Sequence, residues 1–277
     1  MPDRSSEALA RFWEQRAKAF AAADPEGWAA VCWGAPMYFN AYINWAQRNA
    51  VARLLSRFGP SYGDPAVDIG TGTGRWARFL TAHGLSVRGF DVSPTMVARA
   101  RELSPELQFD VASATSLPLE AGTQAVISCI TVLHHLPEAD QEAAIREVHR
   151  LLRPGGACIS IVLLDSFPSG YSCFPRSRRS WSQVFTRCGL EPVVEVGEEF
   201  ATPAILCQFL AMAIRRMIRG PRGSSDPAAG TGHGLAASLY RAVHRPLVYL
   251  SYPLEATAGR WWPTAPATSL AGLYVKR

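Results

Sequence analysis

The strongest constraint on the fold of this chain is a glycine-rich segment at residues 66–76, which reads AVDIGTGTGRW. A short apolar run reaches Asp68, and three glycines then follow at alternate positions, Gly70, Gly72 and Gly74. Glycine tolerates positive φ and carries no side chain, so the backbone can turn sharply and a ligand can approach it closely. An apolar periodic segment resumes directly after the turn. The segment therefore predicts a strand, a tight turn and a helix, the unit that binds nucleotides in open α/β sheets.

The spacing of the glycines separates two kinds of nucleotide ligand. A dinucleotide-binding loop carries G-x-G-x-x-G, whereas this chain has G-x-G-x-G followed by Arg75. A second apolar run, residues 87–90, leads into Asp91, an acid about 20 residues beyond the glycines, where it can accept hydrogen bonds from a ribose diol. A pyrophosphate would favour the additional glycine. The pattern therefore favours an adenosine that is attached to an uncharged or zwitterionic group.

Further motifs follow the glycine turn in a coherent order. The four blocks are VDIGTGTG (67–74), GFDVSPTM (89–96), ATSLPL (114–119) with VLHHL (132–136), and LLRPGG (151–156). In these blocks the chain resembles the class I S-adenosylmethionine-dependent methyltransferases, over roughly residues 50–165 and more loosely over 178–197. The resemblance implies S-adenosyl-L-methionine as cofactor and an α/β fold, with a Rossmann-like, doubly wound, mostly parallel sheet of seven strands.

Alternating apolar runs and helical patterns predict the order of the elements. Strands are expected near 66–69, 87–90, 108–111, 125–130 and 157–164, with helices between them. Ser93 is expected to cap a helix whose first residue is Pro94, and the PGG at 154–156 is expected to end a helix before the fifth strand. Another helix and strand are expected within 178–197, and residues 269–277 should form a final antiparallel strand. Such alternation predicts a doubly wound sheet.

Helical segments are expected on both sides of this core in the sequence. Residues 1–58 are predicted to form an N-terminal helical cap, in which a helix over 7–23 precedes an aromatic-rich connector and a second helix that runs to about Phe58. The cofactor-binding core is expected at 59–199, a helical insertion at 200–268 and the last core strand at 269–277. The connector's aromatic residues either pack a helical layer on the sheet or form a wall of the substrate pocket. They are Trp28, Trp33, Tyr38, Phe39, Tyr42 and Trp45.

The predicted insertion at 200–268 carries the excess positive charge of the chain. It contains seven arginines against Asp226 and Glu255, which leaves +5, the same as the net charge of the whole chain. Two apolar-basic helices are expected, about 203–219 and 235–252, with a stretch rich in glycine, serine and proline between them. Such helices either cap the substrate site with their arginines in solvent, or bind an anionic lipid surface or an anionic, apolar substrate.

The resemblance also implies which residues contact the cofactor. The glycine turn and Asp68 would lie beside the methionine portion, with Asp68 near the ammonium, and Asp91 would bind the ribose hydroxyls. Val92 and Met96 would pack on the adenine, unless they are ordinary core side chains. Ser113 stands where many relatives carry Asp, so it would accept the hydrogen bond of the adenine amino group without charge assistance. The expected cofactor-binding residues are Asp68, Gly70, Thr71, Gly72, Gly74, Asp91, Val92, Met96, Ser113, Ala114 and Ile130.

A general base is expected where the fourth strand ends. His134 and His135 follow that strand, and a histidine titrates near neutrality, so it can take the proton of an acceptor hydroxyl. We assign His135 to this position, either as the catalytic base or only as a pocket residue, with Asp165 and Tyr171 as alternative pocket residues. No covalent nucleophile is required, because methyl transfer from a sulfonium is a direct displacement.

The resemblance implies a methyltransferase, and we expect it to act on oxygen or nitrogen of a small molecule, in specialised metabolism or in lipid or glycan tailoring. One alternative is a cofactor-binding protein of the same fold that catalyses a non-methylating reaction such as cyclisation. Another is a lipid methyltransferase at a membrane surface. A nucleic-acid partner is not expected, because the chain lacks the Asn/Asp-Pro-Pro-Tyr/Phe motif used on base amino groups.

Cysteine usage and hydropathy bear on the compartment. The six cysteines are scattered without a C-x-x-C pair, so neither a metal site nor a disulfide is expected. The N-terminus lacks the apolar segment of a signal peptide, and no apolar run reaches the ~20 residues that span a bilayer. A cytoplasmic location is therefore expected, with peripheral membrane contact through 200–268 as an option.

Overall fold

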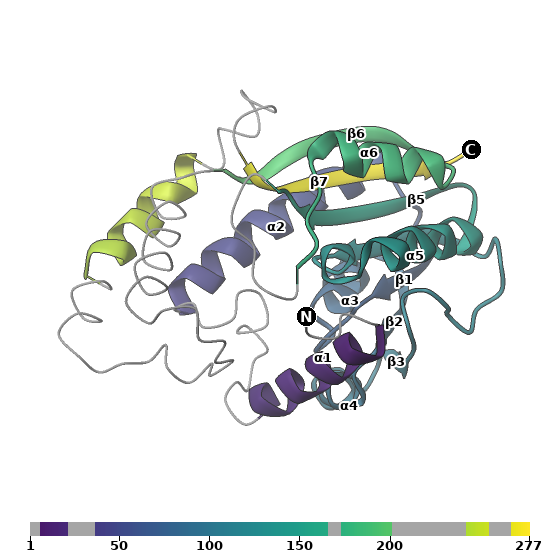
Figure 1. Cartoon of the computed structure of the whole chain (residues 1–277), viewed down its shortest axis with the longest axis horizontal. Helices are drawn as coiled ribbons and strands as arrows, with labels where there is room; N and C mark the ends of the chain where they lie inside the picture. The colour runs from purple at the N-terminus through teal and green to yellow at the C-terminus, as the bar shows by residue number, and fades with distance from the viewer. Residues whose placement is uncertain (1–5, 22–36, 166–172, 201–241, 255–266) are drawn as a thin grey trace.

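The computed structural model describes residues 6–21, 37–165, 173–200, 242–254 and 267–277. In this part of the chain, seven strands form one sheet in the order β3-β2-β1-β4-β5-β7-β6 (Figure 1). Their bounds are β1 (Pro65–Ile69), β2 (Ser86–Asp91), β3 (Gln108–Val111), β4 (Gln124–Ile130), β5 (Leu152–Leu163), β6 (Leu190–Phe200) and β7 (Ala267–Lys276). The first five strands are parallel, and β7 lies antiparallel between β5 and β6. The predicted α/β fold with a mostly parallel, seven-stranded sheet is confirmed.

Helices cover both faces of the sheet. One face packs against α2 (Met37–Phe58), α3 (Arg75–Ala82) and α4 (Pro94–Leu103), and the other against α5 (Glu138–Leu151) and α6 (Arg178–Arg187). Successive side chains of a strand point to opposite faces, so Ala66 packs in the first layer whereas Val67 and Ile69 pack in the second. Because both faces are covered, the central strands are near-continuous apolar runs rather than alternating ones.

The strand order brings three chain segments to one edge of the sheet. Strand β1 pairs with β2 on one side and with β4 on the other, and all three are parallel. The residues that follow their carboxyl ends therefore lie next to one another, at the point where the strand order reverses. This edge gathers the glycine turn after β1, Asp91 at the end of β2 and the histidine pair after β4.

The predicted aromatic connector is partly wrong, because α2 begins earlier than expected. Tyr38, Phe39, Tyr42 and Trp45 all lie within this helix, which starts at Met37. The helix buries residues around much of its circumference, including polar ones, so its sequence lacks the single apolar stripe that identifies a surface helix. Trp28 and Trp33 lie outside the described residues.

The PGG motif does not separate a helix from the fifth strand as predicted. Helix α5 ends at Leu151, and β5 begins at the next residue. The pairing of β5 with β4 shifts register between Gln124 and Val126 of β4, and Gly155 of β5 has a φ of 75°. Four residues of β5, 153–156, therefore lie opposite one residue of β4, and the motif is a large bulge inside the strand that includes a left-handed glycine.

The structure describes one helix of the predicted insertion, at 242–254, where the sequence predicted 235–252. Val248 of this helix packs with Phe39 and Tyr42 of α2. The Nδ1 of the fully buried His244 lies 2.9 Å from the hydroxyl of Tyr38. The other predicted helix, 203–219, and the stretch at 220–234 lie outside the described residues. No helix in the described ranges combines the length and hydropathy that crossing a bilayer requires.

A carboxylate of helix α1 (Ser6–Ala21) binds the first turn of α4. Glu14 accepts hydrogen bonds from the hydroxyls of Ser93 and Thr95, both at 2.6 Å, and from the backbone N–H of Thr95 at 3.2 Å. Ser93 is the N-cap of α4, and its Oγ also accepts from the N–H of Met96, which confirms the predicted cap. Burial would raise the pKa of Glu14, but the hydrogen bonds from Ser93 and Thr95 outweigh it and lower the pKa to about 2.

We predict that Glu14→Ala releases α1 from α4 without unfolding the sheet. Hydrogen bonds to a charged group are worth about 1.5–3 kcal/mol each, so amide hydrogen exchange in α1 should accelerate at least about tenfold at pH 7. The matched control is Glu7→Ala on the same helix, whose carboxylate is largely exposed. Because the folded pKa is depressed, the contribution of Glu14 is complete above its ordinary pKa of 4.5 and is lost as pH falls toward about 2. Unchanged exchange in Glu14→Ala would contradict this role.

Candidate functional site

The loop after β1 has the tight conformation that its glycines predict. Gly70, Gly72 and Gly74 have φ values of 66°, 54° and 81°, in the left-handed region that favours glycine. A Cβ at position 70 would overlap the side chain of Val132, so the loop fits closely against the segment that follows β4. A Cβ at position 72, in contrast, would meet no atom within 4 Å. The middle of the loop therefore faces open space, where a ligand can approach the backbone.

Asp68 lies buried beneath this loop and connects it to the neighbouring strand. Its carboxylate accepts hydrogen bonds from Ser128 Oγ at 2.6 Å and from Thr71 Oγ1 at 2.7 Å. The parallel register places Asp68 opposite Ser128, so the sheet itself creates the first contact. Burial raises the pKa of Asp68 to about 6, against the hydrogen bonds from Ser128 and Thr71 and the charge of Arg75. A positive ligand group nearby would favour the ionised form.

Asp91 lies at the end of β2 with both carboxylate oxygens oriented by backbone donors. Oδ2 accepts from the N–H of Gly72 at 2.8 Å, and Oδ1 accepts from the N–H of Ser93 at 2.9 Å. Burial raises the pKa of Asp91, and the charge of Glu14 adds to this, while the backbone donors oppose it. An ionised carboxylate has about four lone-pair directions. With the N–H groups of Gly72, Ser93 and Val92 as donors, Asp91 can still accept a hydrogen bond from a hydroxyl group beside the loop.

The other residues assigned to the cofactor divide between the site and the core. Val92 is 37% exposed next to Asp91, so the core alternative is wrong for this side chain. Met96 is buried, as that alternative has it, and Ile130, which was expected near the methionyl chain, is buried as well. Ser113 is exposed, with its Oγ 2.9 Å from Thr115 Oγ1. The half-buried Ala114 packs against the apolar core between the sheet and helices α5 and α6. The hydroxyl of Thr71, another residue assigned to the cofactor, donates a hydrogen bond to Asp68.

Two features of this edge were not predicted from the sequence. Thr131, directly after β4, has a φ of 59° and is the single non-glycine residue with positive φ in the described ranges. Such a conformation costs free energy and is common at functional sites. In addition, Arg75 donates to Asn44 Oδ1 at 2.7 Å and to Gln47 Oε1 at 3.2 Å, which ties the loop to α2. Polar residues on the buried side of a helix were the available signal for this contact.

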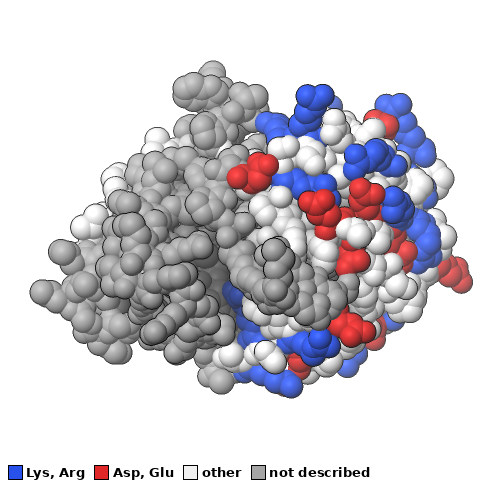
Figure 2. Space-filling view, in the orientation of Figure 1, with Lys and Arg blue, Asp and Glu red and all other residues white. Residues whose placement is uncertain are grey.

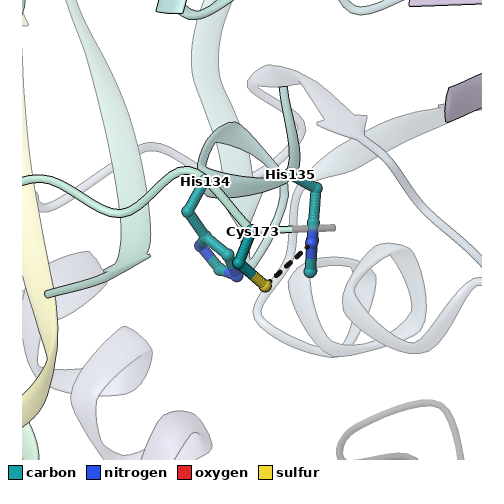
Figure 3. Close-up of side chains that lie close together, drawn as sticks. All are labelled: His134, His135 and Cys173. Carbon is teal, nitrogen blue, oxygen red and sulfur yellow. Dashed lines mark hydrogen bonds between the residues drawn. The ribbon is translucent and has the colours of Figure 1, made fainter. Parts of the chain in front are cut away.

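The two histidines after β4 occupy different environments (Figure 3). His134 is buried, and its Nδ1 accepts a hydrogen bond from the N–H of Leu163 at 3.1 Å. Burial, with a smaller effect from the charge of His135, holds the pKa of His134 well below its ordinary value. His135 is half-buried, and its Nδ1 lies 3.5 Å from Cys173 Sγ. Because its pKa is held low, His134 is a poor base. His135 is therefore the candidate general base of the two histidines.

Segments from distant parts of the chain meet at His135. The ring of Trp13, from α1, contacts it edge-on, with 4.6 Å between the ring centroids. Of the alternative pocket residues, Asp165 is exposed after β5, and Tyr171 lies outside the described residues. Neither Cys173 nor Trp13 was assigned from the sequence, because nothing in their local patterns marks a contact with His135.

Comparisons with known proteins agree with this geometry. Residues 66–156 match the model of a family described as a methyltransferase domain. The 27-O-demethylrifamycin SV methyltransferase of Amycolatopsis mediterranei (strain S699) is 34% identical over 139 residues, which cover 47% of this chain and 50% of that protein. The chain spans about half the length of the curated relatives it matches.

Solved structures extend the likeness beyond the matched segment. The [4+2]-cyclase SpnF has a TM-score of 0.55 at 18% identity, over 84% of this chain and 81% of its own. The Haemonchus contortus phosphoethanolamine N-methyltransferase 2, solved in complex with S-adenosyl-L-methionine, has a TM-score of 0.53 at 18% identity, over 84% of this chain and 52% of its own. Residues 66–156 are therefore similar to a methyltransferase domain, and the fold is that of the class I S-adenosylmethionine-dependent methyltransferases.

Proposed function

We propose that this protein is an S-adenosylmethionine-dependent methyltransferase that methylates oxygen or nitrogen of a small molecule. The observation that carries the proposal is the pair of acids, Asp68 and Asp91, held on either side of a glycine loop that faces open space at Gly72. The cofactor presents an ammonium and a ribose diol, which suit these two acids. The similarity to the 27-O-demethylrifamycin SV methyltransferase supports a small-molecule acceptor.

In this proposal the residues of the edge divide the binding of S-adenosyl-L-methionine among them. Asp68 lies near the ammonium, the three glycines lie under the methionine portion, and Asp91 accepts from the ribose hydroxyls. The adenine is bound by Val92, Met96, Ser113 and the backbone of Ala114, while Ile130 lies near the methionyl chain. When bound, the cofactor supplies a methyl group activated by a sulfonium. The residues of this chain orient it, exclude water and, at His135, take a proton from the acceptor hydroxyl.

Asp91→Ala is expected to weaken the binding of S-adenosylhomocysteine, the demethylated cofactor, in isothermal titration calorimetry. Each lost hydrogen bond to the charged carboxylate is worth about 1.5–3 kcal/mol, so the affinity should fall at least about tenfold. Circular dichroism and thermal unfolding check that the variant is folded. The control is Asp110→Ala on the neighbouring strand, where the acid pairs with Arg88 at the surface. Native-like affinity in a folded Asp91→Ala protein would refute the assignment, and a wild-type protein without affinity would refute the cofactor.

The pH dependence of the same binding reports on Asp68. Its pKa of about 6 leaves about a tenth of the carboxyl groups ionised at pH 5. Binding of an ammonium requires the ionised form, so the affinity for S-adenosylhomocysteine should rise about tenfold between pH 5 and pH 7. Asp68→Asn should bind S-adenosylhomocysteine weakly, and its affinity should not rise between pH 5 and pH 7. This result would show that the rise comes from the titration of Asp68 rather than from Asp91 or a histidine. A flat wild-type profile over this range would contradict the role of Asp68.

The alternative reaction is a cyclisation or another non-methylating use of the cofactor. It is supported by the likeness of the fold to the [4+2]-cyclase SpnF. The two readings differ in the fate of the cofactor. A methyltransferase converts S-adenosyl-L-methionine to S-adenosylhomocysteine and labels the acceptor with the cofactor's methyl group, whereas a cyclisation leaves the cofactor unchanged.

No nucleic-acid partner is proposed, because a nucleic-acid site requires a concentrated basic surface. Figure 2 shows Lys and Arg side chains interspersed with Asp and Glu over the described part of the visible face, without a continuous basic stripe. This distribution agrees with the balanced charge of the chain outside 200–268.

A peripheral membrane contact is the second candidate, and one helix face supports it. In the helix at 242–254, His244, Val248 and Ser251 are buried. Its exposed large apolar side chains are Val243 (53%), Tyr249 (55%), Leu250 (61%) and Leu254 (49%). Arg245 lies over the ring of Tyr249, 5.9 Å from the centroid. By helical spacing, Val243, Leu250 and Leu254 share one exposed side of the helix, and Arg245 and Tyr249 lie on another. Exposed apolar, tyrosine and arginine side chains on one helix suit the interface of an anionic bilayer, and the acceptor would then be a lipid.

Liposome flotation tests this contact. The full-length protein should float with vesicles of phosphatidylcholine and phosphatidylglycerol, less so at high salt, and not with phosphatidylcholine alone. The double variant Leu250→Glu, Leu254→Glu should remain in the unbound fraction. Val111→Glu, at a half-exposed apolar position on β3, is the matched control and should float. If the wild-type protein shows no salt-sensitive flotation, only a substrate cap remains as the role of this segment.

A further inference from the structure

Three side chains contact or lie close to the imidazole of His135, and two of them, His134 and Cys173, are drawn with it in Figure 3. Cys173 Sγ lies 3.5 Å from its Nδ1, the ring of His134 lies 4.3 Å away between centroids, and Trp13 of α1 contacts it edge-on. The residue after Cys173 is anchored, because the N–H of Phe174 donates to the carbonyl of His134 at 2.6 Å. The sulfur is therefore held beside the ring by the backbone rather than by an exposed loop tip.

The protonation of His134 is fixed by the backbone. The N–H of Leu163 points at its Nδ1, which must accept, so a neutral ring carries its proton on Nε2. Ligand atoms of His134, His135 and Cys173 all lie within 4.8 Å of one another, a spacing that a metal ion could bridge. Coordination by Nε2 of His134 would move its proton to Nδ1, directly against the N–H of Leu163. The cluster therefore does not offer three metal ligands.

The contact between His135 and Cys173 has two forms. Either the thiol donates to Nδ1, and the ring proton is on Nε2, or Nδ1–H donates to the sulfur, and Nε2 holds the lone pair. A base needs a lone pair on the nitrogen that faces the acceptor. In histidine-base sites a third group commonly orients the imidazole and selects its tautomer, as a carboxylate does in the hydrolase triads.

We propose that Cys173 is a positioning residue for His135, whose sulfur accepts the Nδ1–H and so makes Nε2 the proton-accepting nitrogen. The inference rests on the proposed function, in which the acceptor hydroxyl loses its proton. The O–H bond of the acceptor breaks, its proton goes to Nε2, and the resulting imidazolium keeps its Nδ1–H on the sulfur before it releases the other proton to water.

The surroundings give the sulfur a further part in this step. The positive charge of the imidazolium faces the neutral ring of His134. Helix α1 adds a second positive charge, because the guanidinium of Arg16 lies 5.3 Å from the centroid of the Trp13 ring. Arg16 opposes the charge and His134 does not compensate it. The sulfur, as a polarisable acceptor at Nδ1, contributes to stabilising the protonated form.

Nitrogen NMR of the full chain, labelled with ¹⁵N at histidine, tests the tautomer directly. Long-range ¹H–¹⁵N spectra distinguish Nδ1–H from Nε2–H imidazoles, and His135→Gln identifies the signals of His135. The wild-type ring should be in the Nδ1–H form, Cys173→Ala should shift it toward Nε2–H, and Cys173→Ser should restore Nδ1–H because a hydroxyl also accepts. Cys188→Ala, which removes a buried thiol at the end of α6, should leave the spectrum unchanged. A wild-type Nε2–H ring, or a tautomer indifferent to Cys173→Ala, would overturn the proposal.

Two further measurements separate this proposal from its competitors. Calorimetry with Zn²⁺ should detect no stoichiometric site that Cys173→Ala removes. Tight 1:1 binding that depends on His134, His135 and Cys173 would overturn the proposal in favour of a metal centre. Calorimetry with S-adenosylhomocysteine should give the same affinity for the wild type and Cys173→Ala. Absent binding in the wild type would refute the proposed function, whereas a wrong tautomer with intact binding would refute only the role of Cys173.

Discussion

The buried carboxylate of Asp68 is the interaction on which the rest of the site depends. Burying a charge without hydrogen bonds is costly. Asp68 is therefore tolerated at the end of β1 because Ser128 and Thr71 donate hydrogen bonds to its carboxylate. Those two donors come from the neighbouring strand and from the glycine loop. The acid therefore fixes the relative position of β1, β4 and the loop, and through the loop's N–H at Gly72 it also fixes where Asp91 lies.

Features that are encoded in a few adjacent residues were predictable. The glycine turn, the acid at the end of β2 and the Ser93 cap each depend on local backbone preferences, and the structure has all of them where the sequence places them. The start of α2 and the irregularity within β5 were not predictable. The first is hidden because that helix is buried on several sides, and the second because the strand pairing, rather than the local sequence, decides how the PGG motif is used.

The candidate site divides in the same way. His135 follows from its place directly after a predicted strand, but its partners do not. Cys173 is 38 residues from His135 in sequence, and Glu14 is 79 residues from Ser93. Contacts between residues so far apart in the chain leave no periodic pattern in a single sequence, because each residue also fits the local preferences of its own helix or loop. The residues that orient the predicted ones are therefore visible only once the chain is folded.

The antiparallel strand β7 has a consequence for how the molecule is made. It comes last among the described strands in chain order, yet it lies between β5 and β6 and pairs with both. Until β7 has left the ribosome, β6 has no neighbour in the sheet and β5 presents an open edge. Long-range pairing of this kind is slow to form, and unpaired edges attract other strands. This half of the sheet is therefore where we expect a nascent chain to need protection from aggregation.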